Sequence, residues 1–188
     1  MANFSLLVQD LFSYIVDDIG FHLYEIKDDL VIWKKEKYFI RVCYDKRYSH
    51  EIDFGIYVEN SIEPQFDINE ILEIAGMPPR TQAFQASDET RLFRVLETIS
   101  LLFFDVCKHV DLFSSESMEL LKKIRDKNCN NYTMENRITQ FKNTEETIWK
   151  EKKYDALVEL YEKNKDILTA LQKKRLEYAK RKMLTDTV

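Results

Sequence analysis

Polar residues that could act together are concentrated in two neighbouring segments of the chain, 38–44 and 51–59. Both segments alternate apolar with polar residues, which is the period of a half-buried β-strand. If the two pair as a hairpin, an arginine, two carboxylates and a tyrosine share one face, where they could bind a ligand or a partner. A glycine on that face leaves room for a ligand or another backbone. These candidate binding residues are Arg41, Glu51, Asp53, Gly55 and Tyr57.

The same residues allow two further interpretations. Glu51 and Asp53 could hold a divalent cation together with water, but two protein ligands make a weak site. An enzyme site built from Arg41, Glu51, Asp53 and Tyr57 would require a concave pocket with perturbed carboxylates. A solvated face on which Arg41 pairs with acidic neighbours explains the pattern without any ligand. We therefore expect no metal site and no catalytic residues here.

A second candidate surface is the basic side of the last predicted helix, 166–183. Lys173, Lys174, Lys180 and Arg181 lie opposite its apolar stripe and could follow a phosphate backbone. However, the chain has a net charge of -5, and no aromatic residues interleave with the basic ones, as single-strand binders require. Nucleic-acid binding is therefore less favoured than a solvated helix surface or a docking site for an acidic protein.

The composition excludes several classes of enzyme. The chain has 3 glycines, whereas phosphate loops and dinucleotide fingerprints need several glycines where the backbone approaches the phosphate. The 3 cysteines and 3 histidines are widely scattered, so we expect neither a disulfide framework nor a zinc site. Asp53-Phe54-Gly55 matches the magnesium-binding triplet of protein kinases, but no other kinase motif accompanies it. We expect no cofactor.

The element around which these segments must pack is the longest apolar-rich run, 92–110. Its apolar residues recur at the spacing of an amphipathic helix, and Ser87, Asp88 and Glu89 before it favour a helix start. We predict a central helix over 88–110. Its core face contains Leu92, Val95, Leu96, Ile99, Leu102, Phe103, Val106 and Val110, whereas Phe93, Leu101 and Phe104 lie on its back.

The other periodic stretches complete an α+β fold. A helix over 4–19 precedes four strands at 21–27, 30–34, 38–44 and 51–59, whose short connections favour an antiparallel meander. Short helices follow at 68–75 and 115–127. The turn-prone run Asn128 to Asn131 predicts a boundary, beyond which two amphipathic stretches separated near Asn164 predict a helical hairpin.

The fold class is thus α+β: a small antiparallel β-meander packed on helices, followed by a mostly helical C-terminal half that ends in a helical hairpin. We expect a core domain over 1–127, with its sheet at 21–59, and a charged hairpin over 132–188 that docks on the core or on a partner chain.

These observations favour a non-enzymatic protein-interaction module, such as an inhibitor, an immunity-type protein or an adaptor, with an unidentified protein partner. An enzyme on the polar sheet face and a nucleic-acid binder are the alternatives. Self-association is a further expectation because the back of the central helix and the hairpin carry apolar residues without an assigned cover. No signal sequence or membrane span is recognisable, so we expect a cytoplasmic protein with no membrane contact. Abundant Lys, Ile, Asn and Tyr is compatible with a bacterial or phage genome.

Overall fold

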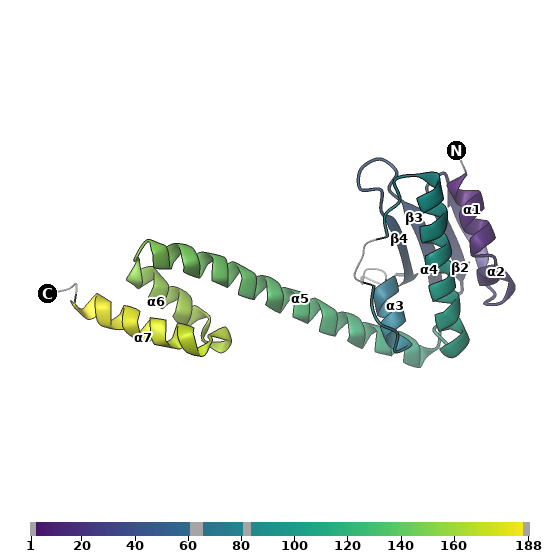
Figure 1. The fold of residues 1–188 in the computed structure, drawn as a ribbon. Helices are drawn as coiled ribbons and strands as arrows, with labels where there is room; N and C mark the ends of the chain where they lie inside the picture. The colour runs from purple at the N-terminus through teal and green to yellow at the C-terminus, as the bar shows by residue number, and fades with distance from the viewer. Residues whose placement is uncertain (1–2, 61–65, 81–83, 186–188) are drawn as a thin grey trace. The chain divides into compact units, whose positions relative to one another are not determined.

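The computed structural model describes residues 3–60, 66–80 and 84–185 (Figure 1). Contacts divide the chain into two compact units, Met1–Asp126 (the first unit) and Lys127–Val188 (the second unit). None of the helices in this described part is long and apolar enough to cross a membrane. The elements in chain order are α1 (Phe4–Leu11), α2 (Tyr14–Asp17), β1 (His22–Lys27), β2 (Leu30–Lys35), β3 (Tyr38–Tyr44), β4 (Ile52–Val58), β5 (Phe66–Asp67), α3 (Ile68–Ile74), α4 (Glu89–His109), α5 (Ser115–Lys150), α6 (Tyr154–Lys163), a 3-10 turn (Lys165–Ile167) and α7 (Ala170–Thr185).

The first unit contains an antiparallel sheet in the order β1-β2-β3-β4-β5, which confirms the predicted meander and adds a short fifth strand. Short hairpins place Trp33 opposite Ile40 and Val42 opposite Phe54, so that alternate residues of each strand lie on one face. Strand β1 lies at an edge, and its register with β2 shifts between Leu23 and Glu25. The shift is a bulge that interrupts the regular pairing of the edge strand.

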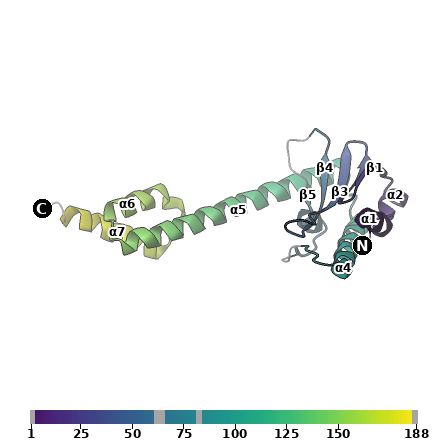
Figure 2. The same cartoon turned by 90° about the horizontal axis from the view of Figure 1, so that it is seen from above.

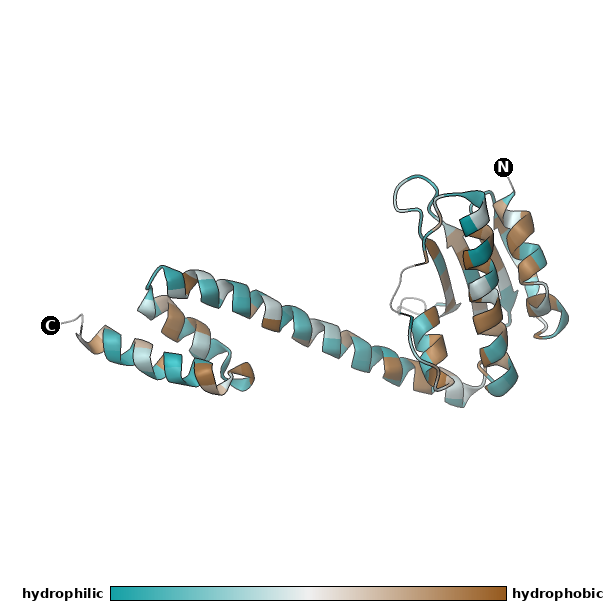
Figure 3. Ribbon diagram, viewed as in Figure 1, coloured by the Kyte–Doolittle hydropathy of each residue, from teal (hydrophilic) through white to brown (hydrophobic). Residues whose placement is uncertain are grey.

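Helices α1 and α4 cover one face of this sheet (Figures 1 and 2). Phe12, which directly follows α1, is fully buried, with its ring 6.0 Å from that of Trp33 and 5.8 Å from that of Phe54. The Phe103 ring of α4 lies 4.8 Å from that of Phe54 on the same face. The apolar residues of α1 and α4 are visible in Figure 3. The central helix and α1 therefore cover this face of the sheet together.

The predicted core face of α4 is largely buried. Asp88 caps the helix by accepting a hydrogen bond from the Arg91 backbone N–H at 2.8 Å. Leu92, Leu96, Ile99, Phe103 and Val106 are buried, and Val95, Leu102 and Val110 are half-buried. On the back of the helix, Phe93 and Leu101 are 41% and 62% exposed, whereas the Phe104 ring lies 4.8 Å from that of Tyr14.

A buried ion pair ties α3 to the first turns of α5. Asp67 accepts hydrogen bonds from the backbone N–H groups of Asn69 and Glu70, and the Glu70 carboxylate accepts from the Asp67 N–H in return, which forms a capping box. Arg125 donates to both oxygens of the Glu70 carboxylate, at 3.0 and 2.5 Å, and its guanidinium lies 4.6 Å from the centre of the Phe66 ring. The buried Glu70 carboxylate thus caps a helix and neutralises the half-buried Arg125.

Two predicted helix boundaries are wrong. The helix expected over 4–19 is interrupted after Leu11 and resumes at Tyr14. The break expected at Asn128 to Asn131 is absent, because α5 runs without interruption from Ser115 to Lys150. Figure 3 shows that this helix is mostly hydrophilic, and residues 129–136 are all exposed. The turn-prone asparagines are therefore accommodated in a solvated stretch of helix.

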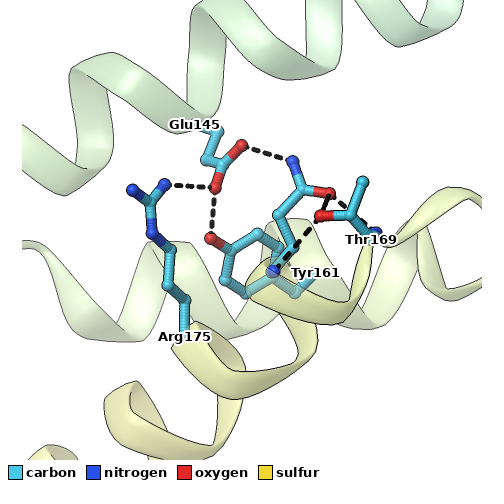
Figure 4. A network of polar contacts seen from close by, with 5 residues as sticks. Glu145, Tyr161, Thr169 and Arg175 are labelled. Carbon is cyan, nitrogen blue, oxygen red and sulfur yellow. Dashed lines mark hydrogen bonds and ion pairs between the residues drawn. The ribbon is translucent and has the colours of Figure 1, made fainter.

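The second unit contains the C-terminal part of α5 and the α6–α7 hairpin, with a break near Asn164 as predicted. Its core has a polar centre, because Glu145 of α5 is only 5% exposed (Figure 4). The Glu145 carboxylate accepts hydrogen bonds from the Tyr161 hydroxyl at 2.5 Å, Gln172 Nε2 at 2.6 Å and Arg175 Nη1 at 2.9 Å. The buried apolar residues around it are Phe141, Leu157, Tyr161, Leu168 and Ala179.

Candidate functional site

The sheet face opposite α1 and α4, here called the outer face, contains most of the predicted binding residues. The strand register places Arg41 opposite Gly55, Cys43 opposite Asp53, and Phe39 opposite Tyr57. Four of the five candidates, Arg41, Asp53, Gly55 and Tyr57, therefore share this face, because residues directly opposite each other on paired strands point to the same side.

Aromatic rings form a row across the outer face. The rings of Phe39 and Tyr57 are stacked, with their centres 4.7 Å apart and their planes 4° apart. The Tyr24 ring of β1 meets Phe39 edge-on at 5.4 Å. Lys34 Nζ lies 4.8 Å from the centre of the Phe39 ring and donates a hydrogen bond to Glu59 at 2.8 Å. We call Tyr24, Phe39 and Tyr57 the aromatic row; Phe39 is 5% exposed, Tyr57 is half-buried and Tyr24 is 57% exposed.

Beside this row, Arg41 and Asp53 neutralise each other. Arg41 Nη2 donates a hydrogen bond to Asp53 Oδ2, and the two side chains are 36% and 41% exposed. The Cys43 thiol lies 3.9 Å from the same oxygen. Burial raises the pKa of Cys43, against the effect of Arg41 and in the same direction as that of Asp53, so the thiol stays protonated at neutral pH. Burial also raises the pKa of Tyr57. Cys43 could act as a nucleophile only as a thiolate, so it is held here in its unreactive, protonated form.

Glu51 is the one candidate that precedes the strand. It lies in an isolated bridge with Gln85, and its carboxylate oxygen is 3.5 Å from Gln85 Nε2. The Asp53 carboxylate, by contrast, is engaged with Arg41, so the two carboxylates have different partners. Across the described ranges, no group of three or more histidine, cysteine or acidic residues could hold a metal ion.

The basic residues of the last helix do not form a uniform stripe. Lys180 Nζ donates to Glu162 at 2.5 Å, and Arg181 Nε donates to the Glu177 carbonyl at 3.4 Å. Lys173 and Lys174 are exposed. Lys174 also lines a cavity of ≈ 450 Å³ next to aromatic residues of three helices, an arrangement that the sequence of α7 alone could not indicate.

A larger groove, of ≈ 1220 Å³, lies at one end of the sheet, between the β3–β4 connection and the start of α4. Several of its lining residues are acidic, but two of them have structural roles. Asp45 accepts hydrogen bonds from the backbone N–H groups of Arg47, Tyr48 and Ser49, and Asp88 caps α4. These backbone hydrogen bonds lower the pKa of both carboxyl groups. Asp45 thus stabilises the loop, and Asp88 stabilises the start of α4.

Comparison with known proteins gives no relative for this chain. No family model, no curated protein and no solved structure matches it.

Proposed function

We propose that the protein is a non-enzymatic interaction module of the cytoplasm, and that the outer face of its sheet binds a partner protein. The observation that carries this proposal is the aromatic row Tyr24, Phe39 and Tyr57, which lies on the face opposite α1 and α4. Tyrosine is enriched at protein interfaces because it contributes a large rigid apolar surface together with one hydrogen-bonding group.

The charges of the outer face indicate the chemistry of the partner. Lys34 is paired with Glu59, Arg41 with Asp53, and Lys27 with Glu25. A strongly charged partner would have to compete with these pairs for the same cations or carboxylates. A partner with an apolar or aromatic side chain at its centre, and hydrogen-bonding groups around it, would leave the pairs intact. This is the usual arrangement of an interface, with an apolar centre and a polar rim.

Enzymatic chemistry on the same face has less support. For Asp53 to act as a general base, or Arg41 to bind an anionic substrate, the ion pair between them would have to open first. The neighbouring Cys43 is protonated at neutral pH for the reason given above. The face is better suited to contact than to proton transfer.

The proposal can be tested by photo-crosslinking in the cell that produces the protein. A photoreactive amino acid at Tyr24 or Tyr57 should capture one predominant protein, whereas the same group at Tyr48, which is 87% exposed in the first unit, should not. The captured partner would then be purified and its affinity measured with the variants Tyr24→Ser and Tyr57→Ser. We expect each variant to bind about tenfold more weakly or worse, as for central interface residues.

Tyr48→Ser and Tyr132→Ser are controls, because both tyrosines are exposed and neither belongs to a strand of the sheet. The proposal would be rejected if all four variants bound the partner equally well. It would also be rejected if the probes at Tyr24 and Tyr57 captured no protein that the probe at Tyr48 did not capture.

A second copy of the chain is the other candidate partner, and the back of α4 favours it. Phe93 and Leu101 are exposed there, about two helical turns apart. Light scattering on the purified protein should give twice the monomer mass of 22.6 kDa if these residues mediate a homodimer. The variant Leu101→Lys should then restore the monomer mass, and a wild-type protein that is already monomeric would exclude this interface.

A further inference from the structure

The geometry points to a nucleotide-binding pocket in the second unit, which we call the aromatic pocket. Its volume is ≈ 450 Å³, within the range of about 300–1,000 Å³ that is usual for small-ligand sites. The rings of Trp149, Tyr154 and Tyr178 come from α5, α6 and α7, and the side chains of Lys152, Lys174 and Arg175 complete most of its wall. This site is separate from the outer face and does not depend on the function proposed for that face.

The rings of the aromatic pocket are held in place by one another. The Tyr178 ring lies 6.1 Å from Trp149 and meets Tyr154 edge-on at 5.8 Å. The Arg175 guanidinium lies 4.7 Å from the centre of the Trp149 ring, and Glu145 fixes it there through a hydrogen bond of 2.9 Å. The buried Glu145 network therefore orients one wall of the pocket. A ligand would meet largely preformed rings, which reduces the entropy lost on binding.

The charge of the aromatic pocket selects against cations and in favour of anions. None of the lining residues is acidic, whereas three are cationic. Arg175 is neutralised by Glu145, but among the residues that the structure describes Lys152 and Lys174 have no carboxylate partner. A cationic ligand would be repelled by both lysines. Arg175 already makes the cation–π contact with the Trp149 ring that such a ligand could use.

A ligand that contacts both the aromatic rings and the lysines must combine a planar ring with negative charge. Nucleobases stack on aromatic side chains, and lysines pair with phosphate as point charges. An acidic peptide would use the lysines but would leave the aromatic rings without a partner. A nucleotide uses both, either as a free molecule or as one residue of a single strand. Further along α7, Lys180 is already paired with Glu162, so it does not add an unpaired positive charge to that of Lys174.

The experiment is a titration of the full-length protein with adenosine monophosphate, followed by tryptophan fluorescence. Trp149 is half-buried in the aromatic pocket, whereas Trp33 is 2% exposed in the core of the first unit and provides a constant background. We expect saturable quenching with a dissociation constant in roughly the millimolar range or tighter. Adenosine lacks the phosphate and ribose phosphate lacks the base, so each should bind about tenfold more weakly or worse.

Two variants test the pocket itself. Tyr178→Ala removes a stacking ring that is 41% exposed, and Lys174→Ala removes an exposed cation, so neither change should prevent folding. Both should weaken binding by about fivefold or more. Lys173→Ala is the matched control, because Lys173 is exposed on the same helix but does not line the pocket, and it should leave the affinity unchanged.

Competition experiments identify the source of the nucleotide and could overturn the inference. Tighter binding of an oligoadenylate than of adenosine monophosphate would assign the pocket to a single strand, whereas equal binding per nucleotide would assign it to the free molecule. No saturable quenching by either probe would reject the pocket as a nucleotide site. Equal binding of ribose phosphate, or of an acidic peptide, with no effect of Tyr178→Ala would also reject it, because charge alone would then explain the binding.

Discussion

Among the residues that the structure describes, each unit buries one carboxylate, and the surroundings of these two carboxylates differ. Glu70 pairs with Arg125 in the first unit, which also contains a continuous apolar core between the sheet, α1 and α4. Glu145 lies at the centre of the second unit, where few apolar residues are fully buried and three polar partners converge on it.

This difference shows how a small helical unit can be held together without a large apolar core. Burying a carboxylate is costly unless hydrogen bonds replace the water that it loses. Glu145 receives such bonds from α6 and α7, so the network joins all three helices of the unit. The first unit should therefore respond most to the loss of apolar volume, and the second unit to the loss of one charge.

The largest effect is expected for Phe103→Ala in α4. Phe103 is fully buried against Phe54, and removing a buried phenylalanine ring costs about 3–5 kcal/mol in free energy of unfolding. Urea denaturation followed at Trp33 in a Trp149→Phe background would measure the loss in the first unit. Leu101→Ala is the control, because this leucine is exposed on the same helix. An equal loss of stability in the second unit would show that the two units unfold together and do not respond differently.

Glu145→Ala should have the next largest effect, and it should be confined to the second unit. The change leaves the Tyr161 hydroxyl and the Gln172 amide without their buried acceptor, which we expect to cost about 2–4 kcal/mol. Hydrogen exchange of the α6 and α7 amides would measure it. The neighbouring Glu146→Ala, on the solvated side of α5, should leave that exchange unchanged. If both variants behaved alike, the Glu145 network would not be central to the unit.

Acidification should produce a smaller effect through Glu145 of the second unit. Burial opposes ionisation of Glu145, but the bonds from Tyr161, Gln172 and Arg175 outweigh it and lower the pKa of this carboxyl below its ordinary value of 4.5. A lowered folded-state pKa means that the stabilisation is complete above the ordinary value and is lost as the pH falls through the folded value. Thermal denaturation of wild type and Glu145→Gln between neutral and acidic pH should show a steeper decline for the wild type. Parallel curves would contradict this.

The smallest effect is expected for Asn130→Ala in the solvated middle of α5. Asn130 is exposed, and alanine is the better helix former by about 0.5 kcal/mol, so this variant should slow hydrogen exchange in the surrounding helix. Lys142→Ala serves as the control, because Lys142 is also exposed and lysine and alanine have similar helix propensities. Faster exchange in Asn130→Ala would mean that the asparagine has a role besides filling a helix position.

The central helix and four of the strands of the first unit could be predicted from the sequence because their signals are local. The helical spacing of Leu92, Leu96 and Phe103 identifies the central helix, and the alternation in 38–44 and 51–59 identifies two paired strands. Most of the candidate residues on the outer face follow from the same alternation. The pairing of Glu51 with Gln85 does not, because it depends on a segment more than thirty residues further along the chain.

The features that could not be predicted depend on residues far apart in the chain. Glu145 sits in a charged run that looks like surface, and its partners come from positions 161, 172 and 175. The aromatic pocket likewise collects its rings from three helices. The run Asn128 to Asn131 has turn propensity, but asparagine costs a helix only about 0.5 kcal/mol per residue, and helical segments on both sides keep α5 continuous.

The bulge in β1 affects the tendency of the protein to aggregate through its edge strand. An edge strand presents unpaired backbone groups, and Leu23, Tyr24 and Ile26 of β1 are each more than 40% exposed. A flat strand of this kind would act as a template for adding further strands and for fibre growth. The irregular register between Leu23 and Glu25, together with the charged pair Glu25 and Lys27, opposes such growth. A variant that straightens this edge should precipitate at concentrations at which the native chain remains clear.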